Sequence, residues 1–354
     1  MKDKVITWIS AVIILIGVVG FIVLVRDGIQ SENEVMRENL EPNLITIGFS
    51  QVGAESDWRT ANSISVKKTF SVDKGYNLIF DDAKQVQKNQ IRAIRGFIQQ
   101  DVDYIIFSPV IENGWDTVLE EAKMAEIPVI ILDRQVNVKD ESLYTAWVGS
   151  DFYAEGQKAC EVLKQYVTKT GMEEVNIVNI QGTIGSTSQL GRTRALEDAV
   201  RANGWHLITQ ESGEYTEARA YEVMKELLET YDNINIVYCE NDNEAFGAIE
   251  AIEDAGKTVG AGGDIQIISF DATRAGLENT LEGKILIDVE CNPLQGAEIE
   301  KIIHKLQQGE HPEKKYYLKE QIFTSAEDIE QIEIRGETYQ VQKTDADVIE
   351  KREY

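Results

Sequence analysis

The feature that most constrains the fold is a repeated alternation between short apolar runs and longer amphipathic stretches. The run 265–270 is mostly apolar, as expected for a strand that a parallel sheet buries on both faces. Within 85–100, Ile91, Ile94 and Ile98 recur at the spacing of one helical face. Strands that alternate with helices in this way predict right-handed crossovers and parallel sheets covered by helices.

The alternation occurs in two successive blocks. It predicts strands over 45–49, 76–80, 104–107, 129–132, 175–180, 206–210, 234–238, 265–270 and 285–289. It predicts helices over 58–74, 85–100, 115–122, 187–202, 221–230, 243–255 and from Pro293 onward. We therefore expect two doubly wound α/β lobes, which also suits a chain too long for one hydrophobic core.

An apolar run at residues 5–25 precedes the first block. At 1.5 Å per residue, a helix of about 20 residues can cross a hydrocarbon core of about 30 Å. Lys2 and Lys4 precede the run, and acidic residues dominate after Arg26. Positively charged flanks of a transmembrane helix face the cytoplasm, so the N-terminus should lie inside and the rest of the chain outside. We predict a single transmembrane helix as an anchor over 1–26.

A cleaved signal peptide would show the same order of charges. The run is longer than the roughly 7–15 residues of a signal-peptide core. No small-x-small cleavage site follows the run before Arg26, and the first cysteine is Cys160, too late for lipid modification near the start. These features favour an uncleaved anchor, followed by a polar linker over 27–43.

A formal net charge of −26 argues against binding to nucleic acid or docking on anionic lipid. The cysteines Cys160, Cys239 and Cys291 are too few and too scattered for a disulfide framework or a zinc site. We expect buried thiols, no metal and no cofactor.

The unusual polar residues follow the predicted strands. Ligands of open α/β sheets bind beyond the carboxyl ends of the strands. Sugar hydroxyls pair with carboxylates, amides and the arginine fork, and an aromatic ring packs on the C–H face of a sugar. The residues that follow the strands are therefore of the types that bind a sugar.

Three residues near strand ends suit purely structural roles. Asn243 suits a helix cap, Trp115 suits the hydrophobic core, and Arg194 suits an ordinary surface charge.

Several segments resemble the bacterial galactofuranose-binding proteins, a branch of the ribose/galactose-type periplasmic binding proteins that serve ABC transporters. The opening segment 48–59, GFSQVGAESDWR, carries the most specific similarity. The resemblance extends over roughly residues 44–318 and includes the segments 88–95, 109–110, 114–115, 126–129, 132–134, 139–144, 181–186, 241–242 and 270–271.

The resemblance implies the type I fold of periplasmic binding proteins, with two lobes joined by a hinge. We accordingly assign 44–150 and 292–322 to the first lobe, 151–291 and 323–340 to the second, and 341–354 to a C-terminal tail. The positions that match the family's ligand residues are Glu55, Trp58 as a stacking ring, Arg59, Asp133, Arg134, Arg192, Tyr215 as an aromatic wall, Asn241, Asp271 and Glu290 near the hinge.

The implied function is an extracytoplasmic receptor that closes over a monosaccharide and presents it to an ABC transporter permease. The predicted anchor leaves open a second role, as a sugar sensor that signals to a partner histidine kinase. Which sugar binds, and in which ring form, stays open. Cys291 replaces a polar ligand of ribose-binding relatives, and the segment after Phe323 is longer than the family pattern.

Other classes fit less well. The sequence contains no phosphate-binding loop, dinucleotide motif or nucleophile elbow. Asp133 and Asp271 could form the carboxylate pair of a glycosidase, but a sugar-binding site needs such groups for binding alone. A repressor of the same fold would carry a basic helix-turn-helix in place of the apolar N-terminal run. We therefore predict a binding protein and not an enzyme.

Overall fold

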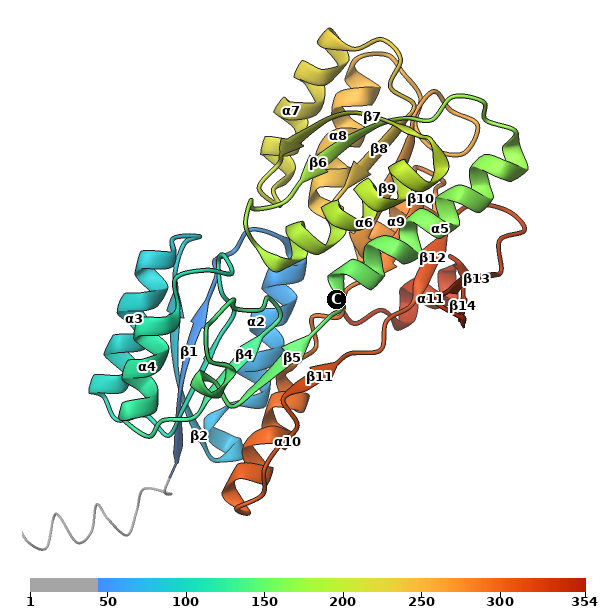
Figure 1. The fold of residues 1–354 in the computed structure, drawn as a ribbon. Coiled ribbons are helices and arrows are strands. Elements are labelled where there is room, and N and C mark those ends of the chain that lie inside the picture. The colour runs from blue at the N-terminus through green and yellow to red at the C-terminus, as the bar shows by residue number, and fades with distance from the viewer. Residues whose placement is uncertain (1–43) are drawn as a thin grey trace, which may run out of the picture. The chain divides into compact units, whose positions relative to one another are not determined.

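The computed structural model describes residues 44–354 (Figure 1). The predicted anchor over 1–26 and the linker over 27–43 lie outside the described residues. From residue 44 onward, no helix combines the length and the apolar character that a membrane crossing needs.

The first sheet is built from the N-terminal block and one later strand. β1 pairs with β3, β3 with β4, β4 with β5 and β5 with β11, all in parallel. In spatial order the sheet contains β11 (Lys315–Tyr317), β5 (Ala146–Gly149), β4 (Val129–Leu132), β3 (Tyr104–Phe107), β1 (Ile45–Gln51) and β2 (Tyr76–Asp82).

Helices cover this sheet. They are α2 (Asp57–Thr69), α3 (Gln87–Gln99), α4 (Asp116–Met124) and α10 (Gly296–Gln307), with short 3-10 turns at Val72–Lys74 and Glu141–Leu143. α3 and α4 pack on one side, where Ile94, Leu119 and Phe107 share a core with the fully buried Trp115. Trp115 is therefore a core residue. α2 packs against α10, which joins the lobe from far along the chain (Figure 1).

The second sheet is parallel apart from one pairing. β12 runs antiparallel to β10, and the other pairs are parallel. In spatial order the sheet contains β15 (Gln342–Lys343), β12 (Ile322–Thr324), β10 (Ile285–Glu290), β9 (Gln266–Asp271), β8 (Ile236–Cys239), β6 (Asn176–Gln181) and β7 (His206–Ser212).

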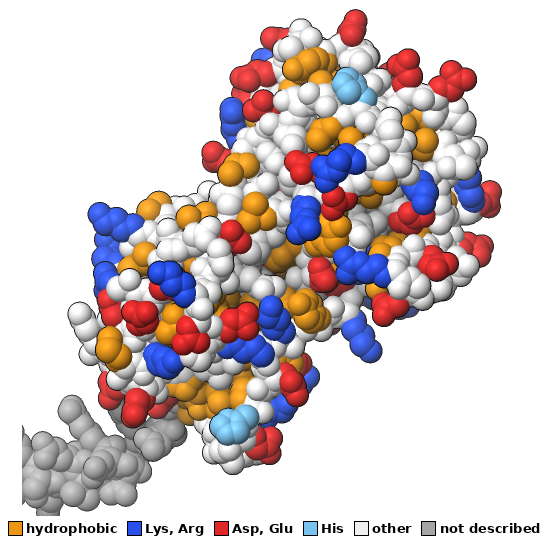
Figure 2. Space-filling view, viewed as in Figure 1, with side chains coloured by type: hydrophobic (Ala, Val, Ile, Leu, Met, Phe, Trp, Pro, Cys, Tyr) orange, Lys and Arg blue, Asp and Glu red, His pale blue; other side chains and the backbone are white. Residues whose placement is uncertain are grey.

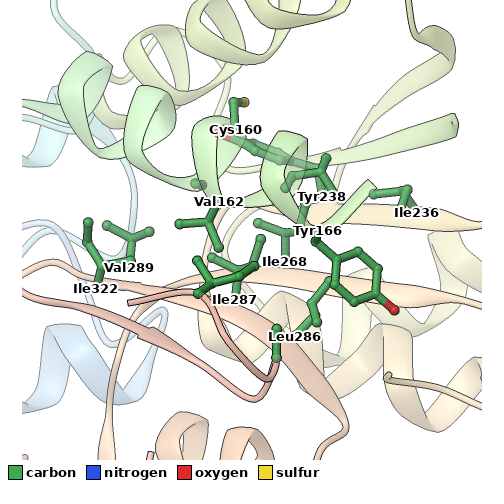
Figure 3. Close-up of a cluster of buried hydrophobic side chains, with 14 of the residues drawn as sticks. Cys160, Val162, Tyr166, Ile236, Tyr238, Ile268, Leu286, Ile287, Val289 and Ile322 are labelled. Atoms are coloured by element: carbon green, nitrogen blue, oxygen red, sulfur yellow. The ribbon is translucent and has the colours of Figure 1, made fainter. Parts of the chain in front are cut away.

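Helices also cover both faces of the second sheet. They are α5 (Phe152–Thr170), α6 (Thr187–Asn203), α7 (Glu217–Thr230), α8 (Asp242–Asp254), α9 (Arg274–Leu281) and α11 (Ala346–Lys351). Figure 3 shows one core, in which Val162 and Tyr166 of α5 lie over Ile268 and Ile287 of the sheet. A second core forms where α7 and α8 pack on the sheet. The predicted pair of α/β lobes is thus confirmed.

The chain passes between the lobes more than once. It leaves the first sheet after β5, returns to the first lobe after β10, and crosses to the second sheet again between β11 and β12. Connections of this kind allow two lobes to move about a hinge of a few residues.

Some predicted element ends are wrong for local reasons. α7 begins at Glu217 rather than at Tyr221, because the Thr216 hydroxyl accepts a hydrogen bond from the amide of Arg219 and caps the helix. The helix predicted from Pro293 begins at Gly296, because the Asn292 side chain accepts from the amide of Leu294 and closes a turn.

The segment predicted as a tail, 341–354, is folded. β15 pairs with β12, and Asp345 caps α11 by accepting from the amide of Val348. Before it, β13 (Gln331–Ile334) and β14 (Glu337–Gln340) form an antiparallel hairpin. α11 packs against α9 of the second lobe.

On the face shown in Figure 2, acidic and basic side chains are interspersed. Cys160, Cys239 and Cys291 are buried free thiols, as predicted.

Candidate functional site

A cavity lies between the two lobes at the carboxyl ends of strands from both sheets, with about 270 Å³ of empty space that includes its opening to solvent. The first lobe contributes residues that follow β1 and β4, and the second contributes residues that follow β8, β9 and β10. The lining residues are Glu55, Ser56, Trp58, Arg59, Asp133, Arg134, Phe152, Ser188, Arg192, Tyr215, Asn241, Asp271 and Cys291.

The structure brings together every predicted site residue except one. Glu290 does not line the cavity, because Arg352 and Tyr354 hold its carboxylate on another side of β10. The sequence prediction also missed Ser56, Phe152 and Ser188, which lie at or near helix starts. Cys291 lines the cavity as well, and its place directly after β10 is a signal that could have predicted this.

The first lobe presents a buried network of two arginines and two carboxylates. Glu55 Oε1 accepts from Arg134 Nη2 at 2.6 Å and from Arg59 Nε at 3.2 Å. Arg59 Nη2 lies 2.7 Å from Asp133 Oδ2. Burial alone would lower the pKa of Arg59, but Asp133 and Glu55 outweigh it and raise the pKa. All of these side chains are nearly inaccessible to solvent, so each charge is neutralised locally.

This network keeps some hydrogen-bonding capacity for a ligand. Among the described residues, Glu55 Oε2 and Arg134 Nε are buried polar atoms without a hydrogen-bond partner. One is an acceptor and the other is a donor, and both residues line the cavity. A ligand hydroxyl group can pair with either atom, since it donates one hydrogen bond and accepts others.

Trp58 is held rigidly on α2. Ser56 caps that helix by accepting from the amide of Arg59 at 3.1 Å. The indole Nε1 of Trp58 donates to the carbonyl of Cys291 at 2.5 Å, and its ring packs with Phe152 and Cys291. The indole is thus fixed as one apolar surface of the cavity.

In the second lobe, Arg192 is the central cation. Its Nε donates to Glu155 Oε2 at 2.9 Å, its Nη1 donates to the carbonyl of Glu240, and its Nη2 lies 3.6 Å from Asp271 Oδ1. The guanidinium also lies 4.7 Å from the ring centroid of Phe270. Burial raises the pKa of Asp271 well above its ordinary value, and Arg192 opposes that shift.

Tyr215 lines the cavity from the second lobe, and its ring faces Arg134 of the first lobe. Its hydroxyl donates to Ser188 Oγ at 2.7 Å, and the Arg134 guanidinium lies 5.1 Å from its ring centroid. A Cβ atom on Gly182 would lie 1.9 Å from the Tyr215 ring, so only glycine at 182 lets the ring take this position.

Asn241, and not Asn243, caps α8. Asn241 Oδ1 accepts from the amide of Glu244 at 2.8 Å, while its Nδ2 donates to the carbonyl of Tyr215 at 3.3 Å. The predicted cap Asn243 instead accepts from the amide of Asp57 in the first lobe at 3.0 Å. Asn243 is therefore a contact between the lobes.

Two further hydrogen bonds join the first lobe to the second. The amide of Gln135 donates to Thr187 Oγ1 at 2.9 Å, and the amide of Glu112 donates to the carbonyl of Gly185 at 2.9 Å. The structure therefore shows the lobes in contact around the cavity, as expected of a closed state.

One cluster beside the cavity has the residue types of a metal site. Ligand atoms of Glu155, Cys291 and Glu320 lie within 4.8 Å of one another. Burial raises the pKa of the Cys291 thiol and of the Glu320 carboxyl well above their ordinary values. Metal ions bind the deprotonated forms of these groups. We therefore assign no metal to this cluster.

The stability of the fold is expected to fall as pH rises from about 4 to about 7. Burial raises the pKa of Glu240 to about 7 and that of Asp242 to about 6. In the unfolded chain these carboxyls titrate near pH 4, so the folded protein binds more protons within this window. The folded state is favoured at the acid end, and Glu240→Gln should flatten the pH dependence.

The measurement is the melting temperature between pH 4.5 and 7.5 for the wild type, Glu240→Gln and Glu229→Gln. Glu229 is exposed on α7 and serves as the matched control. An unchanged slope in Glu240→Gln would show that Glu240 does not cause the pH dependence.

The fold and the site define a two-lobed binding protein with a polar interlobe cavity. The model of the periplasmic binding protein domain family matches residues 47–310. The chain belongs to this family, whose members are extracytoplasmic. The type I fold predicted from the resemblance is confirmed.

Similar proteins include the galactofuranose-binding protein YtfQ of Escherichia coli K12, which is 36% identical over 81% of this chain and 91% of its own length. A solved structure from Mycobacterium smegmatis in complex with beta-D-fucofuranose is 39% identical, with a TM-score of 0.76 over 79% of this chain and 91% of that one. The binding component of the arabinose ABC transporter from Shewanella sp. ANA-3, bound to L-arabinofuranose, is 36% identical, with a TM-score of 0.74 over 79% of this chain and 92% of that one. These relatives are sugar-binding proteins and not enzymes, in agreement with the prediction.

Proposed function

We propose that this protein is an extracytoplasmic receptor that closes its lobes over a monosaccharide in furanose form and presents the sugar to an ABC transporter permease. The observation that carries the proposal is the cavity itself. Arg59, Arg134 and Asp133 face it from the first lobe, and Arg192 and Asp271 face it from the second. A small ligand with hydroxyl groups around its whole edge would pair with both sets at once.

The cavity also favours a ligand with an apolar face. Trp58, Phe152 and Tyr215 contribute rings to its lining. An aromatic ring packs well on the C–H face of a sugar, and the polar groups then fix its orientation. The proposed ring form rests on the relatives named above, whose sugars are galactofuranose, fucofuranose and arabinofuranose.

A thermal-shift screen of the chain from residue 32 onward tests the receptor proposal. Galactose, fucose, arabinose, ribose and fructose are added at rising concentrations, with the open-chain polyol mannitol as a control. A ligand present at 100 times its Kd stabilises the native state by about 2.7 kcal/mol, so we expect a rise of about 5 °C or more in Tm. If no sugar raises Tm, the proposed function is wrong.

Residues 5–25 support a further part of the proposal, that a transmembrane anchor tethers the receptor. The full chain should stay with membranes after washing at alkaline pH, which releases peripheral proteins. A variant that starts at residue 32 should be released to the soluble fraction. Recovery of the full chain in the soluble fraction, shortened at its N-terminus, would indicate a cleaved signal peptide.

The sensory role is the second candidate, and the apolar N-terminal run favours it because transport receptors are normally released or lipid-anchored and not held by a transmembrane helix. A strain that lacks this protein distinguishes the two roles. Loss of uptake of the radiolabelled sugar supports transport. Normal uptake together with loss of the sugar-induced transcriptional response supports signalling to a histidine kinase.

A further inference from the structure

The segment 345–354, which we call the strap, packs on the second lobe beside the loop that carries Asp271. Val348 and Ile349 of α11 pack against a small core formed by Ala272, Leu277 and Phe323. The strap lies beyond the residues matched by the family model, which end at 310. It is therefore a feature whose role family membership does not explain.

The loop that follows β9 has a strained backbone. Asp271 has a φ of 105° and Ala272 a φ of 51°, in a region that residues other than glycine rarely occupy. Such conformations persist only where the surrounding contacts hold them. Asp271 lines the cavity, so the contacts that hold this loop also determine where its carboxylate points.

Three successive backbone amides, two in the loop and one at the start of α9, each have a partner. The amide of Ala272 donates to Asp288 Oδ1 at 3.0 Å, and the amide of Thr273 donates to Asp242 Oδ2 at 2.8 Å. The amide of Arg274 donates to the carbonyl of Tyr354 at 2.7 Å. Two of these acceptors are buried carboxylates of the second lobe, and the third belongs to the strap.

The strap is fixed in turn to β10. Arg352 Nη1 donates to Glu290 Oε1 at 2.5 Å, and the Tyr354 hydroxyl donates to the same oxygen at 2.7 Å. Glu290 is paired with Asp271 in the parallel register of β10 and β9. The side chains of Arg352 and Glu290 are each only 7% exposed, so water screens this ion pair little.

We propose that the strap is a positioning element of the ligand site: Arg352 and Tyr354, anchored on Glu290, hold the strained loop that directs Asp271 into the cavity. Neither strap residue lines the cavity. The effect on sugar affinity rests on the proposed function, whereas the effect on the loop does not.

The first test measures amide hydrogen exchange in the ligand-free protein. Arg352→Met removes the ion pair, Tyr354→Phe removes only the hydroxyl contact, and Lys351→Met is the matched control, because Lys351 is exposed on the same segment. We expect exchange at Ala272, Thr273 and Arg274 to rise about tenfold in Arg352→Met and less in Tyr354→Phe. Amides of β8 serve as an internal check that the lobe stays folded.

The second test measures sugar affinity in a double-mutant cycle between Arg352 and Asp271. Arg352→Met should weaken binding about tenfold in the wild-type background and less than about twofold in the Asp271→Ala background, because the strap acts through Asp271. A residue that only supported global stability would have the same effect in both backgrounds.

The outcomes separate the two proposals. If the wild-type protein binds no sugar, the proposed function fails, and the exchange experiment still decides whether the strap holds the loop. Unchanged exchange at 272–274 in Arg352→Met, with β8 intact, overturns the positioning role. Equal losses of affinity in both backgrounds overturn it as well.

Discussion

Replacing Asp271 by alanine is expected to weaken sugar binding by about 100-fold or more while leaving the fold intact. Truncating a buried acidic side chain that pairs with its partners in a site closed to water typically removes about 2–5 kcal/mol of binding free energy. Stability should not fall with affinity, because burial already disfavours the charged form of Asp271. Arg192 also keeps its pairing with Glu155 in the variant.

Isothermal titration with the sugar identified by the screen measures this effect. Asp271→Asn keeps an acceptor oxygen and should bind between the wild type and the alanine variant. Asp264→Ala is a control at the opposite end of β9, where Asp264 is exposed. Affinity that is unchanged in Asp271→Ala would remove Asp271 from the proposed site.

Replacing Glu55 by alanine is expected to destabilise the folded protein by about 3–5 kcal/mol. One oxygen of Glu55 accepts from both Arg59 and Arg134, and the side chains of all three residues are at most 3% exposed. Removing the carboxylate leaves two buried guanidinium groups with only Asp133 to balance them. Their desolvation is then uncompensated, and sugar binding should be lost with the same change.

Urea unfolding of Glu55→Ala and Glu121→Ala tests this prediction. Glu121 forms an ion pair with Arg95 at 2.7 Å, but the two side chains are 31% and 48% exposed. An exposed pair of this kind contributes at most about 1 kcal/mol. Similar losses in the two variants would show that burial does not govern the contribution of the Glu55 network.

The sequence predicted much of the cavity because of how parallel sheets are built. Glu55, Asp133, Asn241 and Asp271 each follow a strand that could be recognised from its own residues. The carboxyl ends of parallel strands lie at one edge of a sheet, so strand direction alone brings Glu55 and Asp133 to one edge of the first sheet and Asn241 and Asp271 to one edge of the second. No contact distance was needed for that prediction.

Residues on helices were harder to assign. Phe152 lies at the start of α5, where nothing local distinguishes a cavity residue from a core residue. The sequence pattern suggests Asn243 as a cap because it stands near a helix start. Asn241 takes that role, and Asn243 reaches Asp57 of the first lobe. Asn241 and Asn243 have the same propensity to cap a helix, so the sequence alone does not show which of them caps α8 and which contacts the first lobe.

The alternation of strands and helices, the two lobes and the residues at strand ends could be predicted from the sequence, because they depend on local patterns of apolar and polar residues. The partner of Glu290 is apparent only in the tertiary structure, where its carboxylate accepts a hydrogen bond from Arg352, 62 residues further along the chain. The contact between the strap and the loop of Asp271, through the carbonyl of Tyr354, is likewise apparent only there. Contacts of this kind depend on how α11 packs against a finished lobe, and no local pattern encodes that packing.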